Sequence, residues 1–225
     1  MRGRGMTRID AFSDVVFGFV LTLLLVSLEV PRDFGELYQT LRGFVPFTIS
    51  FAMLLTLWHA HYVFFRRYGL QDRATILLNS FLLFLVVSCV YPLKFLFSTL
   101  FNPGGEGPGV VTTSSQVTEL MVLYGAGFAA VYFLLAALYA NAWRQRDGLA
   151  LDGLERLLTI SSIVDALGLA AIGLLACFAS LLLPAGWSGL SGYLYLLIAP
   201  WKTVSGTYFA RKARTLRKLV AAPTL

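Results

Sequence analysis

The sequence predicts an all-α, polytopic membrane protein with six transmembrane helices in each subunit, and two observations carry that prediction. Hydrophobic residues make up 57% of the 225 residues, only 13% are charged, and the mean hydropathy is +0.73. Soluble domains carry about 25% charged residues, so this composition excludes an ordinary soluble domain. The apolar residues also fall into runs of about 20, the length that an α-helix needs to cross about 30 Å of hydrocarbon.

Six apolar segments are long enough to cross a membrane. They lie at residues 10–30, 44–65, 74–100, 117–142, 157–183 and 189–210. Residues that end helices follow three of them: Pro31 after the first, residues 102–105 after the third and residues 184–186 after the fifth. Because we find no internal repeat and no soluble segment between them, the six spans predict one transmembrane domain over residues 1–225.

Lysine and arginine are distributed unequally between the two sides of these spans. The side that carries both termini holds Arg2, Arg4, Arg8, Arg66, Arg67, Arg73, Arg144, Arg146, Arg156, Arg211, Lys212, Arg214, Arg217 and Lys218. The other side holds only Arg32 and Arg42, while Lys94 and Lys202 lie near the ends of spans, from where they can reach the interface. The positive-inside rule therefore predicts a cell-membrane protein with both termini in the cytoplasm.

The net charge of +6 is explained by the same distribution. The basic residues are grouped in short segments between apolar runs, which is typical of cytoplasmic loops that face anionic lipid headgroups. We therefore expect membrane lipids, and not nucleic acid, as the partners of these basic segments.

Polar residues at its cytoplasmic end set the first span apart from the others. Arg8, Ser13 and Asp14 lie there, and an unpaired charge inside the membrane costs at least about 2.5 kcal/mol. Asp14 therefore needs a partner, either Arg8 or a donor on another helix. His61 in the second span and Asn79 in the third lie at comparable depth, and both can donate a hydrogen bond. We expect a shared interhelical network; the alternative is a set of separate local hydrogen bonds.

The rest of the first span is apolar on every face, so periodicity alone does not identify a buried stripe. Steps of four and three place Phe19, Leu23 and Val26 on one helical face, with Thr22 beside them. Such a stripe is more often a surface for helix packing than the lining of a pore. The residues alone leave both interpretations open.

Several motifs in the first half of the chain resemble a known family. The run from Arg8 to Asp14 has the form RxxxFSD. It is followed by Val16-Phe17, the segment 21–24, Val30-Pro31, Trp58, His61, Asn79 and Pro92. These motifs resemble the transmembrane protein 175 family of potassium channels, which occur in endolysosomes and, in a shorter form, in prokaryotes. The motifs cover about the first 100 residues, and the later spans match only in hydropathy.

The resemblance implies a homotetrameric potassium channel whose central pore is lined by the first helix of each subunit. It implies a hydrophobic gate on that helix, with constriction layers at Phe19, Leu23 and Val26 and the family's threonine at Thr22. The narrowest layer is usually isoleucine or leucine, so Phe19 departs from the family pattern. This departure affects the size of the constriction and leaves the architecture unchanged.

The polar residues of the first helix also acquire a role from the resemblance. It implies that Arg8, Ser13 and Asp14, together with His61 and Asn79, form the network that braces the pore helix. It further implies that the protein needs no cofactor, and that potassium is the permeant ion.

Two other classes of function compete with a channel. A proton-coupled secondary transporter is the main alternative, because ionisable residues such as Asp14, His61 and Asp165 often act as proton relays. Against it, the sequence lacks the matched pairs of broken helices that such carriers use. An enzyme is not expected, because the sequence offers no metal site or catalytic pair. His59 and His61 lie about 200° apart around a helix and cannot bind the same metal ion. Asp165 has no catalytic partner, and we expect it to hydrogen-bond between helices.

Overall fold

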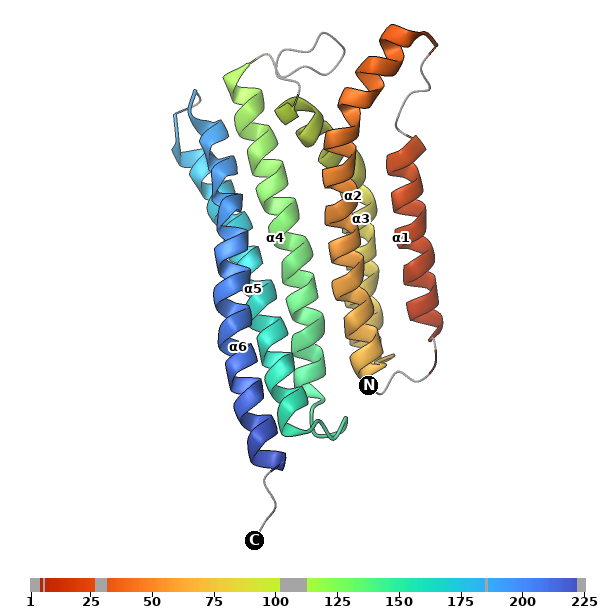
Figure 1. Cartoon of the computed structure of the whole chain (residues 1–225), viewed down its shortest axis with the longest axis vertical. Coiled ribbons are helices and arrows are strands. Elements are labelled where there is room, and N and C mark those ends of the chain that lie inside the picture. The colour runs from red at the N-terminus through yellow and green to blue at the C-terminus, as the bar shows by residue number, and fades with distance from the viewer. Residues whose placement is uncertain (1–4, 6, 27–31, 102–112, 185, 222–225) are drawn as a thin grey trace. The chain divides into compact units, whose positions relative to one another are not determined.

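The computed structural model describes residues 5, 7–26, 32–101, 113–184 and 186–221, and its regular elements there are all helices (Figure 1). In chain order they are α1 (Arg8–Val26), α2 (Phe34–Tyr68), α3 (Arg73–Phe101), α4 (Ser114–Arg144), α5 (Gly153–Leu182), the 3₁₀-helix η1 (Ser188–Leu197) and α6 (Ile198–Ala221). The all-α prediction is confirmed.

Five helices in the described part of the chain are long and apolar enough to cross a membrane. These segments are Arg8–Val26, Phe47–Tyr68, Arg73–Val90, Ser114–Arg144 and Gly153–Leu182. The sixth predicted span, at 189–210, is divided between η1 and the first half of α6. Since α6 continues through the basic residues from Arg211 onward, the helix as a whole is less apolar than the other five.

The chain forms two compact units. The first comprises Met1–Gln71 and Leu83–Leu120, and the second comprises Asp72–Leu82 and Met121–Leu225, so α3 and α4 each contribute to both. Whether residues 1–225 act as one domain remains a prediction.

In the first unit, α1 packs against α2 (Figure 1). Phe17, Val20 and Leu24 of α1 are buried, and steps of three and four put them on one face. The α2 residues Leu54 and Phe64 are buried as well.

The second unit is held together partly by polar contacts at the start of α3. Asp72 precedes this helix and accepts hydrogen bonds from the Thr75 backbone (3.3 Å) and from Nδ2 of Asn141 on α4 (3.2 Å). Partial burial of the Asp72 carboxyl opposes its ionisation, but hydrogen bonds from Thr75, Gln145 and Asn141 outweigh burial and lower its pKa to about 2. The ionised Asp72 therefore ties the start of α3 to the end of α4.

In the same unit, α6 runs beside α5 (Figure 1). The ammonium of Lys202 lies 2.5 Å from an oxygen of Asp165, and the Trp201 indole donates to the Asp165 carbonyl oxygen at 3.3 Å. The prediction that Asp165 bonds between helices is confirmed. Lys202, which we expected to extend to the interface, instead pairs with this carboxylate because a charge left alone in a span is costly.

Glycine allows α4 and α5 to approach closely. A Cβ at Gly125 would lie 2.8 Å from the Cys177 backbone nitrogen and 2.9 Å from the Gly173 carbonyl oxygen. These are distances to backbone atoms, which cannot move aside as a flexible side chain can. Small residues that admit close backbone contact are typical of helix interfaces in membranes.

Substitution of Gly125 by alanine tests this contact. The added Cβ must push α4 and α5 apart, at a cost of about 1–3 kcal/mol. Gly206→Ala in α6 is the matched control, because a Cβ there meets nothing within 4 Å and alanine favours a helix by about 1 kcal/mol over glycine. We expect the thermal unfolding midpoint in detergent to fall for Gly125→Ala and not for Gly206→Ala. Equal midpoints would contradict the close approach.

Candidate pore helix and its polar anchor

The two faces of α1 differ in exposure. Asp10, Ser13, Phe17, Val20 and Leu24 are buried. The opposite face is exposed and contains Arg8, Phe12, Val15, Phe19, Thr22 and Val26, at alternating steps of four and three. An α-helix brings residues at these steps into one stripe. The first helix therefore presents a long, mostly apolar stripe that a single copy of the chain leaves uncovered.

The residues predicted for the constriction lie on this stripe or at its edge. Phe19 is 57% exposed and Val26 is 72% exposed. Thr22 lies between them on the stripe and is exposed, whereas Leu23 is only partly exposed. The structure thus places Thr22 on the face where the sequence stripe had Leu23. Their roles as pore layers remain predictions.

A hydrogen bond between helices anchors the polar end of α1. The indole Nε1–H of Trp58 on α2 donates to Oδ1 of Asp14 at 2.8 Å. A carboxylate in a span is costly unless it is paired, and the indole satisfies one of its oxygens. Arg8 is exposed on the apolar stripe. Trp58 is therefore the donor on another helix that Asp14 requires, and the sequence motif predicted the residue but not this partnership.

Ser13 and Asp10 complete the buried side of this end. The Ser13 hydroxyl donates to the Ile9 carbonyl oxygen at 2.7 Å, a hydrogen bond within α1. Asp10 is buried one turn before Asp14, and its charged neighbours are Asp14 and Arg66 of α2. Asp10 was not predicted as part of this site, although its spacing of four from Asp14 places both carboxyls on the same side of α1.

The structure brings His61 to the buried face of α1. Its side chain is completely buried, and its ring lies 5.4 Å from the Phe17 ring and 4.7 Å from the Phe65 ring, measured between centroids. Asn79 is also buried but belongs to the second unit. Its membership of the bracing network remains a prediction.

These contacts can fix the rotation of α1 about its own axis. Apolar side chains alone specify rotation weakly in a membrane, because lipid tails are as apolar as leucine. The bond from Trp58 to Asp14 and the packing of His61 on Phe17 select one rotation, which leaves Phe19 exposed. Within the described residues, no group of three His, Cys, Asp or Glu side chains is placed to hold a metal ion.

Replacement of Trp58 by phenylalanine tests the anchor. The ring is retained, but Asp14 loses its donor, which we expect to cost about 1–3 kcal/mol of stability. The matched control is Trp187→Phe, because Trp187 is exposed and its hydrogen bonds to Pro184 and Leu190 are made by its backbone. The thermal midpoint in detergent should fall for Trp58→Phe and stay near wild type for Trp187→Phe. An unchanged midpoint for Trp58→Phe would mean that the bond does not hold α1.

Comparison with known proteins identifies the family. Residues 8–91 match the family described as endosomal/lysosomal potassium channel TMEM175. A potassium channel of Marivirga tractuosa is 37% identical over 227 residues, covering 96% of this chain and 92% of the relative. Among solved structures, a variant of the potassium channel MtTMEM175, in complex with a nanobody–MBP fusion, is 35% identical with a TM-score of 0.80. That match covers 93% of this chain and 96% of the solved one.

A second solved structure, a homologue from Chamaesiphon minutus of the lysosomal potassium-selective channel TMEM175, has a TM-score of 0.59. It is 23% identical, and the match covers 88% of this chain and 96% of the other, which supports the fold alone. The motif-bearing helices α1 and α2 and most of α3 lie within the family match. With 37% identity to a relative over nearly its whole length, this chain belongs to the TMEM175 family of potassium channels.

Proposed function

We propose that this protein conducts potassium through a central pore that four copies of the chain form, with α1 of each copy lining it. As a member of the TMEM175 family, the chain is a potassium channel and not an enzyme. The observation that supports the assignment of the pore to α1 is the exposed stripe from Phe12 to Val26, which one copy leaves uncovered.

Several copies are proposed because the chain contains a single set of spans, and the resemblance to the family implies that their number is four. One α1 cannot enclose a pore, so several copies must surround a common axis, and closed cyclic symmetry is the usual solution for identical subunits. In such a ring the stripes of α1 face one another. The family membership of the chain also favours a channel over the proton-coupled transporter that the sequence left open.

The proposed gate is a ring of Phe19 side chains. An apolar ring of this kind closes a pore by expelling water, because a cation without its hydration shell is highly unfavourable in an apolar neck. Conduction then requires the ring to widen until a partly hydrated ion can pass. Thr22 follows Phe19 by one turn of the stripe, and its hydroxyl donates to the Gly18 carbonyl oxygen at 2.9 Å. The lone pairs of that hydroxyl are available to a passing cation.

The proposed setting is the cell membrane, with both termini in the cytoplasm. It is supported by the fourteen basic residues on the side of the termini against two on the other side. Asp14 and its partner Trp58 then lie at the cytoplasmic end of the pore helix. Membrane lipids surround the tetramer, and potassium passes through it as cargo, with no resident cofactor.

A flux measurement tests conduction directly. Purified protein reconstituted into potassium-loaded liposomes should release potassium down its gradient, followed with a potassium-sensitive dye. Protein-free liposomes supply the background, and a matched sodium gradient measures selectivity. Potassium release no faster than the background at every voltage tested would contradict the proposal.

Phe19→Ala tests the gate. Removing the ring should ease wetting of the neck, and a barrier lower by about 1.4 kcal/mol corresponds to about tenfold more flux. Phe133→Ala on α4 is a suitable control, because Phe133 is 61% exposed and Phe19 is 57% exposed. We expect faster potassium flux or weaker selectivity against sodium for Phe19→Ala alone. If Phe19→Ala keeps the flux and selectivity of the wild type, the proposal that Phe19 forms the gate is wrong.

A further inference from the structure

The second half of α6 carries a concentration of positive charge. Its basic residues are Arg211, Lys212, Arg214, Arg217 and Lys218, all of them exposed. The sequence from residue 198 to its last residue contains no aspartate or glutamate. Within the described residues, no carboxylate pairs with Arg211 or Lys212. This end of α6 is therefore a cationic surface whose charge is not neutralised by its own helix.

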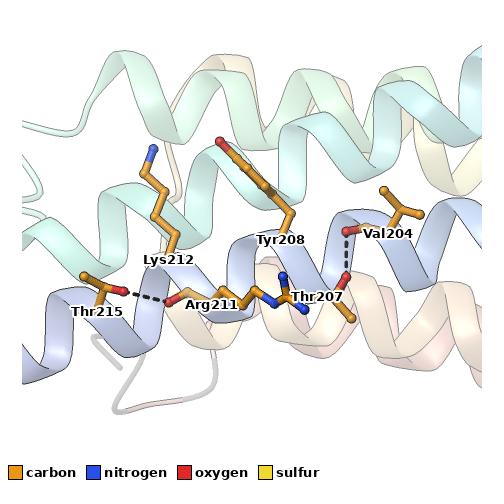
Figure 2. A pocket seen from close by; sticks show the side chains of 6 residues that line it. All are labelled: Val204, Thr207, Tyr208, Arg211, Lys212 and Thr215. Atoms are coloured by element: carbon orange, nitrogen blue, oxygen red, sulfur yellow. Dashed lines mark hydrogen bonds between the residues drawn. The ribbon is translucent and has the colours of Figure 1, made fainter.

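A shallow pocket lies on one side of this cationic surface. It has a volume of about 520 Å³ and is lined by Val204, Thr207, Tyr208, Arg211, Lys212 and Thr215, all from α6 (Figure 2). The first lining residue and the last are about 16 Å apart along the helix axis, at 1.5 Å per residue. The pocket therefore extends from an apolar part of α6 into its basic part.

The two ends of the pocket differ in chemistry. Val204 and Tyr208 are exposed and supply an apolar wall. Arg211 and Lys212 supply two positive charges at the other end. The hydroxyl of Thr207 donates to the Thr203 carbonyl oxygen at 2.8 Å. That bond lies within α6, so the hydroxyl is satisfied without a ligand and its oxygen can still accept a hydrogen bond.

We propose that this pocket binds an anionic phospholipid of the membrane leaflet at the inner end of α6. Arg211 and Lys212 hold the phosphate through charge-assisted hydrogen bonds. The start of an acyl chain lies along Val204 and the ring of Tyr208. A ligand that is both anionic and apolar matches the change in chemistry along the pocket, and clusters of basic residues next to a span are typical sites for anionic lipids.

The apolar wall distinguishes a lipid from a free anion. Inorganic phosphate would use Arg211 and Lys212 but would leave Val204 and Tyr208 exposed to water. Trp201 and Ser205 of α6 form hydrogen bonds with Asp165 of α5, so this part of the helix is held against α5. The binding site does not depend on the proposed pore; only the assignment to the cytoplasmic leaflet depends on the proposed orientation.

Native mass spectrometry of the detergent-solubilised full chain can test the site. Phosphatidylglycerol is the anionic probe, and phosphatidylcholine with matched acyl chains is the neutral one. We expect phosphatidylglycerol to bind in preference, and Arg211→Gln/Lys212→Gln to weaken this binding about tenfold, because the lipid phosphate loses the charge-assisted hydrogen bonds of both side chains. Arg214→Gln/Arg217→Gln is the matched control. It removes the same charge, and Arg217 lies about 120° around the helix from Arg211.

Three outcomes would overturn the proposal. Equal weakening by the two double variants would indicate diffuse attraction to charge. If the wild type binds phosphatidylcholine equally well, binding does not depend on the negative charge of the lipid. If inorganic phosphate displaces the bound lipid, the pocket is a site for free anions. Arg211→Lys/Lys212→Arg keeps both charges and should retain binding, so it serves if the glutamine variant fails to fold. Potassium flux in pure phosphatidylcholine liposomes reports on the channel separately.

Discussion

The hydrogen bond from the Trp58 indole to the Asp14 carboxylate is the contact on which the arrangement of α1 depends. A carboxylate inside a span must be paired, because the hydrocarbon offers it no water. Satisfying Asp14 from α2 settles which side of α1 faces that helix. The buried residues Ser13, Phe17, Val20 and Leu24 then follow by helical periodicity, and so does the exposed stripe that contains Phe19.

The second unit also contains polar pairs that join helices. Lys202 pairs with Asp165 between α5 and α6, and Asn141 donates to Asp72 where α3 begins. Apolar packing alone gives little preference for one helix rotation over another in lipid, whereas a polar pair has one geometry. Close backbone contact at Gly125 adds a steric constraint between α4 and α5. A few polar and small residues therefore define an arrangement whose surface is mostly apolar.

The positions of the first five spans could be predicted because length and hydropathy are properties of the chain alone. The sixth was predicted less well, since hydropathy does not reveal that η1 interrupts the helix before α6. Trp58 was missed as the partner of Asp14 because tryptophan is grouped with the hydrophobic residues, yet its indole N–H is a hydrogen-bond donor. The exposed stripe was predicted to contain Leu23, and the structure has Thr22 there instead. The cause is similar: most of α1 is apolar on every side, so its rotation depends on contacts with α2.

An anchored α1 has a consequence for how the proposed gate opens. If the bond to Asp14 holds the backbone, the aperture at Phe19 changes through the side chain more readily than through rotation of the helix. Long and aromatic side chains on a helix occupy two χ1 positions, near 180° and −60°. Four phenylalanine rings around one axis then give the constriction a small number of discrete sizes. An isoleucine, stiff at χ1 because it is β-branched, would instead hold one size, so that opening would require movement of α1 itself and strain on its anchor.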